Sequence, residues 1–176
     1  MNSDGSKSWE NSPIFYDYKS AGFSGWLKAL SFRSDVRRLV FTNGCFDLVH
    51  SGHIKLFSWI KETWPGGLTL VAVNSDDSVR RLKGAGRPLN GLMDRMIVLS
   101  AMRHVDVVCS FAEDTPSEIV KFVHPDILVK GGDYRDKKIV GEDFVLSYGG
   151  IVQKGPYMPG VSTTELIKTA IGGSPR

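Results

Sequence analysis

The residues best suited to chemistry are two histidines, His50 and His53, with Gly52 between them. Residues three apart share one face of a helix, so both imidazoles are expected on one side of a helix start. Imidazoles donate hydrogen bonds to phosphate oxygens near pH 7, and a pair of them can stabilise charge that builds up on phosphorus. Gly52 leaves room for a ligand near the backbone. The spacing therefore indicates phosphate chemistry.

Two other chemistries are open to the same stretch. Zinc takes at least three protein ligands, and Cys45 or Asp47 could join the histidines, although two core histidines would also explain the pair. A glycine-containing turn between a strand and a helix suits phosphate better than zinc. Cys45 could act as a nucleophile, but no separate base for it is evident and phosphoryl-type transfer needs no covalent intermediate.

The histidines follow an apolar run over 39–41, typical of a buried parallel strand, which breaks at Asn43 and Gly44. A strand, a glycine-containing loop and a helix start form a phosphate site because the backbone N–H groups and the helix dipole face the anion. We expect the helix over 51–64.

Strands are expected to alternate with helices along the rest of the chain. This pattern predicts an α/β protein with a Rossmann-like, doubly wound parallel five-stranded sheet in a single domain. No G-x-G-x-x-G follows the first strand, which argues against a dinucleotide-dependent dehydrogenase. The remaining expected strands cover 68–73, 105–111, 127–130 and 151–154. The remaining expected helices cover 22–37, a short stretch ending at 81, 92–103, the segment that begins at Pro116, 140–148 and the segment after Ser162.

The chain has 176 residues, enough for one domain with a core, and we expect a flexible N-terminal tail over 1–20 and the domain over 21–176. An aromatic group in the tail, Phe15, Tyr16 and Tyr18, could pack on the domain or on a second subunit. A net charge of +3 is too small to indicate nucleic-acid binding. There is no apolar run of membrane-spanning length and no signal pattern, so we expect no membrane association and a cytoplasmic protein with reduced thiols at Cys45 and Cys109.

Further ligand candidates lie at the ends of expected strands and helices. Asn74 and Asp76 end the second strand, where open α/β sheets bind ligands, although Asp76 or Ser75 could instead cap a helix. Lys83 and Arg87 bracket a glycine-rich segment that could close over phosphates or be a solvated loop.

Three more segments carry polar groups with alternative roles. Arg95 is either an ion-pair residue or a phosphate ligand. Asp114 or Thr115 is expected to cap the helix that follows Pro116. Ser162 is expected to cap the last helix, with Glu165 completing a capping box.

The segment 44–53, GCFDLVHSGH, resembles the GxFDxxHxGH signature of the HxGH nucleotidyltransferase superfamily, which includes cytidylyltransferases and adenylyltransferases. Four other segments fall in the order found in bacterial D-glycero-β-D-manno-heptose 1-phosphate adenylyltransferases. These are 74–90, 113–116, 125–134 and 161–168, so the resemblance covers about 38–171.

The resemblance implies transfer of AMP from ATP to a sugar 1-phosphate, giving an ADP-sugar and pyrophosphate. It implies Mg²⁺ carried as the triphosphate complex, a separate sugar kinase that supplies the acceptor, and a homodimer. The catalytic candidates are His50, His53 and Lys55. The nucleotide- and phosphate-binding candidates are Thr42, Asn43, Gly44, Cys45, Phe46, Gly52, Asn74, Asp76, Lys83, Arg87, Lys130, Gly131, Asp133, Ser162, Thr163 and Thr164.

Two alternatives remain. The segment 50–56, HSGHIKL, is also similar to glycerol 3-phosphate cytidylyltransferases, which make CDP-glycerol from CTP. Those enzymes carry an Arg five residues before the Ser of an RTEGISTT motif, where this chain has Tyr157. The other alternative is a nucleotide-binding regulatory module without activity, against which the intact His50, Gly52 and His53 argue.

Overall fold

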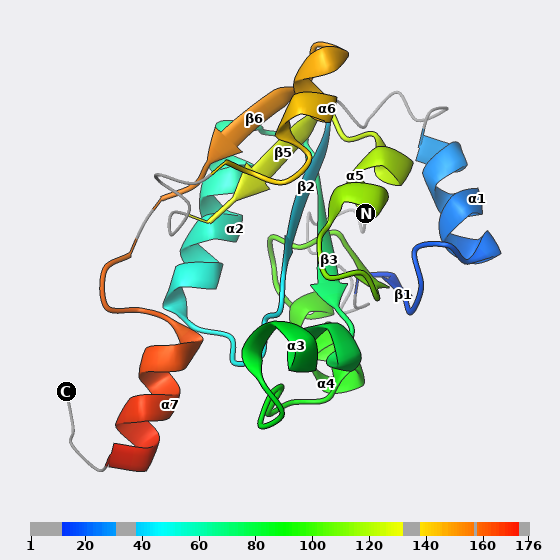
Figure 1. Cartoon of the computed structure of the whole chain (residues 1–176). Coiled ribbons are helices and arrows are strands. Elements are labelled where there is room, and N and C mark those ends of the chain that lie inside the picture. The colour runs from blue at the N-terminus through cyan, green and yellow to red at the C-terminus, as the bar shows by residue number, and fades with distance from the viewer. Residues whose placement is uncertain (1–11, 31–37, 132–137, 157, 173–176) are drawn as a thin grey trace, which may run out of the picture.

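One parallel β-sheet organises the molecule (Figure 1). The computed structural model describes residues 12–30, 38–131, 138–156 and 158–172. Within these residues the sheet has six strands in the order β1-β4-β3-β2-β5-β6. The strands are β1 (Ile14–Phe15), β2 (Leu39–Gly44), β3 (Leu68–Asn74), β4 (Val107–Phe111), β5 (Ile127–Lys130) and β6 (Ile151–Lys154). The helices are α1 (Ala21–Leu30), α2 (Ser51–Thr63), α3 (Asp76–Lys83), α4 (Leu92–Ser100), α5 (Ser117–Val123), α6 (Glu142–Ser147) and α7 (Thr163–Gly172).

The strand order confirms the doubly wound sheet. From β2 the chain moves through β3 to β4, and it then returns to the other side of β2 to form β5 and β6. The direction of winding therefore reverses between β2 and β5, which pair in register from Val40 opposite Ile127 to Thr42 opposite Val129. Open α/β sheets bind ligands at the carboxyl ends of the strands at such a reversal.

The sheet has one strand more than the five expected. Ile14 and Phe15 pair with Val108 and Cys109 at the edge of the sheet, inside the segment expected to be a tail. Tyr18 is only 2% exposed, and the Phe15 ring packs edge-on against Phe23 at 5.3 Å between centroids. Of the two alternatives for the aromatic group, packing on the domain holds for Phe15 and Tyr18. A two-residue strand shows no sequence periodicity, because it exists only through pairing with a distant strand. The expected tail residues 1–11 lie outside the described residues.

Alternate residues of the strands enter two hydrophobic layers. Phe41, Leu70 and Leu128 point to the face covered by α1, α5 and α6. Val40, Val71 and Val129 point to the face covered by α2 and α4. Burial on both faces explains why the strands read as continuous apolar runs rather than alternating ones.

Two local expectations need revision. Pro116 is the N-cap of α5 with no side-chain capping bond, so the expected cap by Asp114 or Thr115 is wrong. Asp114 instead pairs with Arg81. The helix expected over 22–37 ends at Leu30 in the described residues, and 31–37 lie outside them. No helix in the described part of the chain is long and apolar enough to cross a membrane.

Candidate functional site

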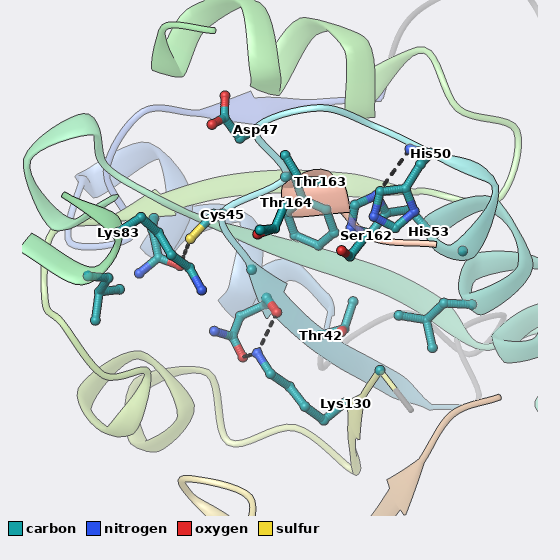
Figure 2. A pocket seen from close by; sticks show the side chains of 18 of the residues that line it. Thr42, Cys45, Asp47, His50, His53, Lys83, Lys130, Ser162, Thr163 and Thr164 are labelled. Carbon is teal, nitrogen blue, oxygen red and sulfur yellow. Dashed lines mark hydrogen bonds between the residues drawn. The ribbon is translucent and has the colours of Figure 1, made fainter. Parts of the chain in front are cut away.

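A cavity of about 690 Å³ opens at the carboxyl ends of β2, β3 and β5 (Figure 2). Its walls come from the segments that follow these strands and from the N-terminal ends of α2 and α7. In Figure 1, α7 lies beyond this end of the sheet, close to the start of α2. The volume suits a small-molecule ligand of nucleotide size.

Most of the predicted site residues line this one cavity, although they are spread over more than a hundred positions of sequence. They are Thr42, Asn43, Gly44, Cys45, Phe46, His50, Gly52, His53, Asn74, Lys83, Arg87, Lys130, Gly131, Ser162, Thr163 and Thr164.

Among the described residues, two predicted site residues, Lys55 and Asp76, are not among those lining the cavity. Lys55 is exposed on α2, because a residue two positions after His53 projects from a different side of the helix. Asp76 pairs with Arg95 through a contact of 2.7 Å between Oδ1 and Nη2. Asp133 lies outside the described residues, as does Tyr157.

The turn after β2 is tight. Phe46 has φ of +49°, a left-handed conformation that costs a non-glycine residue about 1–2 kcal/mol. Its ring is buried, with its centroid 5.0 Å from that of His53. A Cβ on Gly44 would lie 3.1 Å from the same ring, so glycine lets the chain fold back here.

The two imidazoles are stacked, with centroids 3.8 Å apart and planes 23° from parallel. The backbone N–H of His50 donates to Nδ1 of His53 at 3.3 Å. Nδ1 of neutral His53 is therefore the acceptor, which leaves the hydrogen on Nε2. Nδ1 of His50 is buried against the first turn of α2, of which His50 is the N-cap.

Both histidines are uncharged at neutral pH. Burial lowers the pKa of His50, and burial together with the neighbouring His50 lowers the pKa of His53 to about 3. A neutral imidazole with its hydrogen on Nε2 is a hydrogen-bond donor that carries no charge before a ligand arrives. Bound phosphate would raise both pKa values, because a nearby negative charge favours the protonated form.

The structure explains why a glycine, Gly52, lies between the two histidines. A Cβ at this position would lie 3.0 Å from Nδ1 of His50 and 3.7 Å from Val161. A side chain here would require the first imidazole to shift by a few tenths of an ångström, so glycine is well suited to this position.

The start of α7 is held to the loop that precedes α2. Oγ1 of Thr163 donates to the carbonyl oxygen of Leu48 at 3.1 Å. The backbone N–H of Glu165 donates to Oγ of Ser162 at 3.2 Å, which confirms Ser162 as the cap. Two helix N-termini, those of α2 and α7, therefore border the same cavity, and such ends attract anions.

Asp47 is a structural residue of the site that the sequence suggested only as a possible zinc ligand. Its carboxylate is fully buried and accepts hydrogen bonds from Nε of Arg87 and from the backbone N–H groups of Leu89, at 2.7 Å, and Asn90, at 3.0 Å. Arg87 is the predicted phosphate ligand, and Asp47 holds it at the cavity wall. The conformation of the glycine-rich segment is therefore set by a carboxylate about forty residues away.

Arg95 has a similar role, and of its two alternatives the ion pair holds. Its side chain is fully buried, and its guanidinium donates to the carbonyl oxygens of Cys45, at 2.6 Å, and Asn90, at 3.0 Å, as well as to Asp76. A planar guanidinium with several donors can join three segments in this way. The sequence around Arg95 is an apolar helical stretch, which does not indicate these partners.

Two more cavity residues have defined environments. Nζ of Lys130 donates to the carbonyl oxygen and to Oδ1 of Asn43, at 2.7 and 3.0 Å, and so joins the carboxyl ends of β5 and β2. Burial raises the pKa of the Cys45 thiol, which disfavours the thiolate form that a nucleophile requires.

The sequence of this chain is similar to those of known proteins. The family model described as cytidylyltransferase-like matches residues 41–169. A protein named bifunctional protein HldE from Marinomonas sp. is 50% identical over 133 residues, which are 76% of this chain and 28% of that protein. The protein of the same name from Geotalea uraniireducens is 49% identical over 138 residues, 78% of this chain and 28% of that protein. This chain thus spans little more than a quarter of the length of these relatives.

Solved structures share the fold. A lipopolysaccharide core biosynthesis protein from Thermoplasma volcanium superposes with a TM-score of 0.54 at 24% identity, over 68% of this chain and 97% of that chain. Pantothenate synthetase from Thermus thermophilus gives 0.51 at 15% identity, over 83% of this chain and 62% of that chain. With a family model that covers most of its length, the chain belongs to the cytidylyltransferase-like family.

Proposed function

We propose that this protein transfers AMP from ATP to a sugar 1-phosphate, D-glycero-β-D-manno-heptose 1-phosphate, and releases pyrophosphate. The observation that carries the proposal is the meeting of two helix N-termini and two neutral imidazoles, His50 and His53, in one cavity. Such an arrangement suits a triphosphate and the charge that develops on it. Membership of the family supports nucleotidyl transfer, and the similarity to the HldE proteins supports the heptose acceptor.

In the proposed reaction a phosphate oxygen of the acceptor attacks the α-phosphorus of ATP in line. A new P–O bond forms as the bond between the α-phosphorus and its bridging oxygen breaks, and pyrophosphate leaves with that electron pair. The protein positions the two reactants and stabilises the charge. Nε2–H of His53 would donate to a phosphate oxygen, Arg87 would neutralise the leaving group, and Lys83 would bind the phosphate of the acceptor.

Mg²⁺ is proposed to arrive as the complex of the triphosphate. Within the described residues no three His, Cys, Asp or Glu side chains are grouped so that they could hold a metal ion. Mg²⁺ usually keeps several waters and is held partly by substrate phosphates, which is compatible with this cavity. When bound, the ion would offset negative charge on the phosphates.

We also propose a homodimer, which α4 supports. Its solvent-facing residues Met93, Ile97 and Val98 are each about half exposed, and a group of exposed apolar side chains often marks an interface between proteins. Light scattering on a sizing column should give the mass of a dimer, and Ile97→Glu should reduce it to that of a monomer. A monomeric wild-type protein would refute this proposal. A separate sugar kinase is proposed to supply the acceptor.

The test of the activity is a pyrophosphate-release assay with ATP and CTP, each paired with heptose 1-phosphate and with glycerol 3-phosphate. We expect turnover with ATP and heptose 1-phosphate. Turnover with CTP alone would favour a cytidylyltransferase, and tight ATP binding with no turnover would favour a regulatory module. His53→Ala should lower kcat roughly 10²–10³-fold, as loss of one charge-stabilising donor does elsewhere. The circular dichroism spectrum of His53→Ala should match that of the wild type, which would show that the variant is folded.

A further inference from the structure

The loop between β4 and α5 lines the cavity but has no part in the proposed chemistry so far. Asp114, Thr115 and Pro116 all belong to the cavity wall. Because Pro116 is the cap of α5 without a side-chain bond, neither the Asp114 carboxylate nor the Thr115 hydroxyl is used to start that helix. Asp114 pairs instead with Arg81 through one carboxylate oxygen, and the Thr115 hydroxyl is left for a ligand.

The cavity has two chemically different sides, and the strand order separates them. On the β6 side of β2, the segment before α7 contributes Pro156, Met158 and Val161, which are apolar and suit a flat nucleobase. On the β4 side, the walls carry Lys83 and the polar pair Asp114 and Thr115. A cation beside a carboxylate and a hydroxyl suits a phosphorylated polyol, since hydroxyl groups donate to carboxylates. Figure 2 shows Lys83 well apart from Ser162.

The carboxylate of Asp114 is held in place by its neighbour. Nε of Arg81 donates to Oδ1 at 2.7 Å, and Nη2 of Arg81 donates to the carbonyl oxygen of Ala112 at 2.8 Å. Arg81 thus connects the Asp114 side chain to the backbone of the loop that carries it. In the described residues no protein group donates to Oδ2 of Asp114, and the Thr115 hydroxyl has no partner there either. The Asp114 side chain is half exposed, so Oδ2 is accessible to a ligand.

We propose that Asp114 and Thr115 bind the sugar hydroxyls of the acceptor, with Lys83 at the acceptor phosphate, so that these two residues select a polyhydroxylated substrate. The inference rests on the proposed function, because it assumes that the acceptor is a sugar phosphate.

The test is the steady-state kinetics of Asp114→Asn and Thr115→Val with ATP and the sugar 1-phosphate that the wild-type enzyme uses. Asp114→Asn should raise KM for the sugar phosphate roughly 10–100-fold, as expected for loss of a hydrogen bond to a charged group, with KM for ATP unchanged. Glu118→Gln is the matched control, since Glu118 pairs with Lys121 on α5 outside the cavity wall. It should leave both constants unchanged.

Deoxy analogues of the acceptor separate direct contact from a structural effect. If Asp114 binds a hydroxyl, removing that hydroxyl from the substrate should cost the wild type the same factor and cost Asp114→Asn nothing further. An unchanged acceptor KM, or an equal rise in KM for ATP, would overturn the inference while the proposed function stands. A wild-type enzyme that uses no sugar 1-phosphate would overturn both. If Asp114→Asn does not fold, the same comparison of the two KM values is made with Thr115→Val.

Discussion

The buried histidine pair predicts an unusual sensitivity to acid. His53 has a pKa of about 3 in the folded protein, against an ordinary value of 6.5. A group whose pKa is lower in the folded state binds protons more readily when the chain unfolds, so the free energy of unfolding falls as the pH drops below about 6.5. Between about pH 7 and pH 4.5, folded His53 stays neutral while the unfolded imidazole is protonated, which costs about 2–3 kcal/mol of stability.

The variant that isolates this effect is His53→Gln. Its side-chain oxygen can still accept the N–H of His50, but it does not titrate. Urea unfolding at both pH values should show that the wild type loses about 2–3 kcal/mol more stability than the variant. For a domain of this size the thermal midpoint should fall by roughly 5–10 °C more in the wild type. Equal losses would refute the reasoning, because they would mean that His53 titrates alike in the folded and unfolded chains.

Three further predictions concern other residues of the site. Asp47→Asn leaves Arg87 without its buried counter-ion and should lower the free energy of unfolding in urea by about 3 kcal/mol; a loss under about 1 kcal/mol would contradict the role given to Asp47. Ser162→Ala removes the cap of α7 and should destabilise that helix by about 1 kcal/mol, seen as faster amide exchange there, together with weaker ATP binding in a calorimetric titration. Cys45→Ser should retain turnover within about tenfold, because burial raises the pKa of the thiol; complete loss would make the thiol essential.

Several features of this protein follow from local sequence alone. Buried parallel strands read as apolar runs, so β2, β3 and β5 were recognisable without their partners. The glycine-relieved turn, the two histidines and the cap at Ser162 are local patterns, and each depends on residues within about four positions of one another. The alternation of strands and helices along the chain was sufficient to predict a doubly wound sheet, because parallel strands need helical connections between them.

The tertiary structure decided what depends on distant partners. β1 forms only through its pairing with the distant strand β4, and Asp114 at the cavity wall pairs with Arg81, which lies 33 positions earlier in the chain. Arg95 could be read as an ion-pair residue or a phosphate ligand until its partners Asp76, Cys45 and Asn90 were placed around it. The low pKa of His53 likewise comes from burial, which is a property of the assembled core rather than of any short segment.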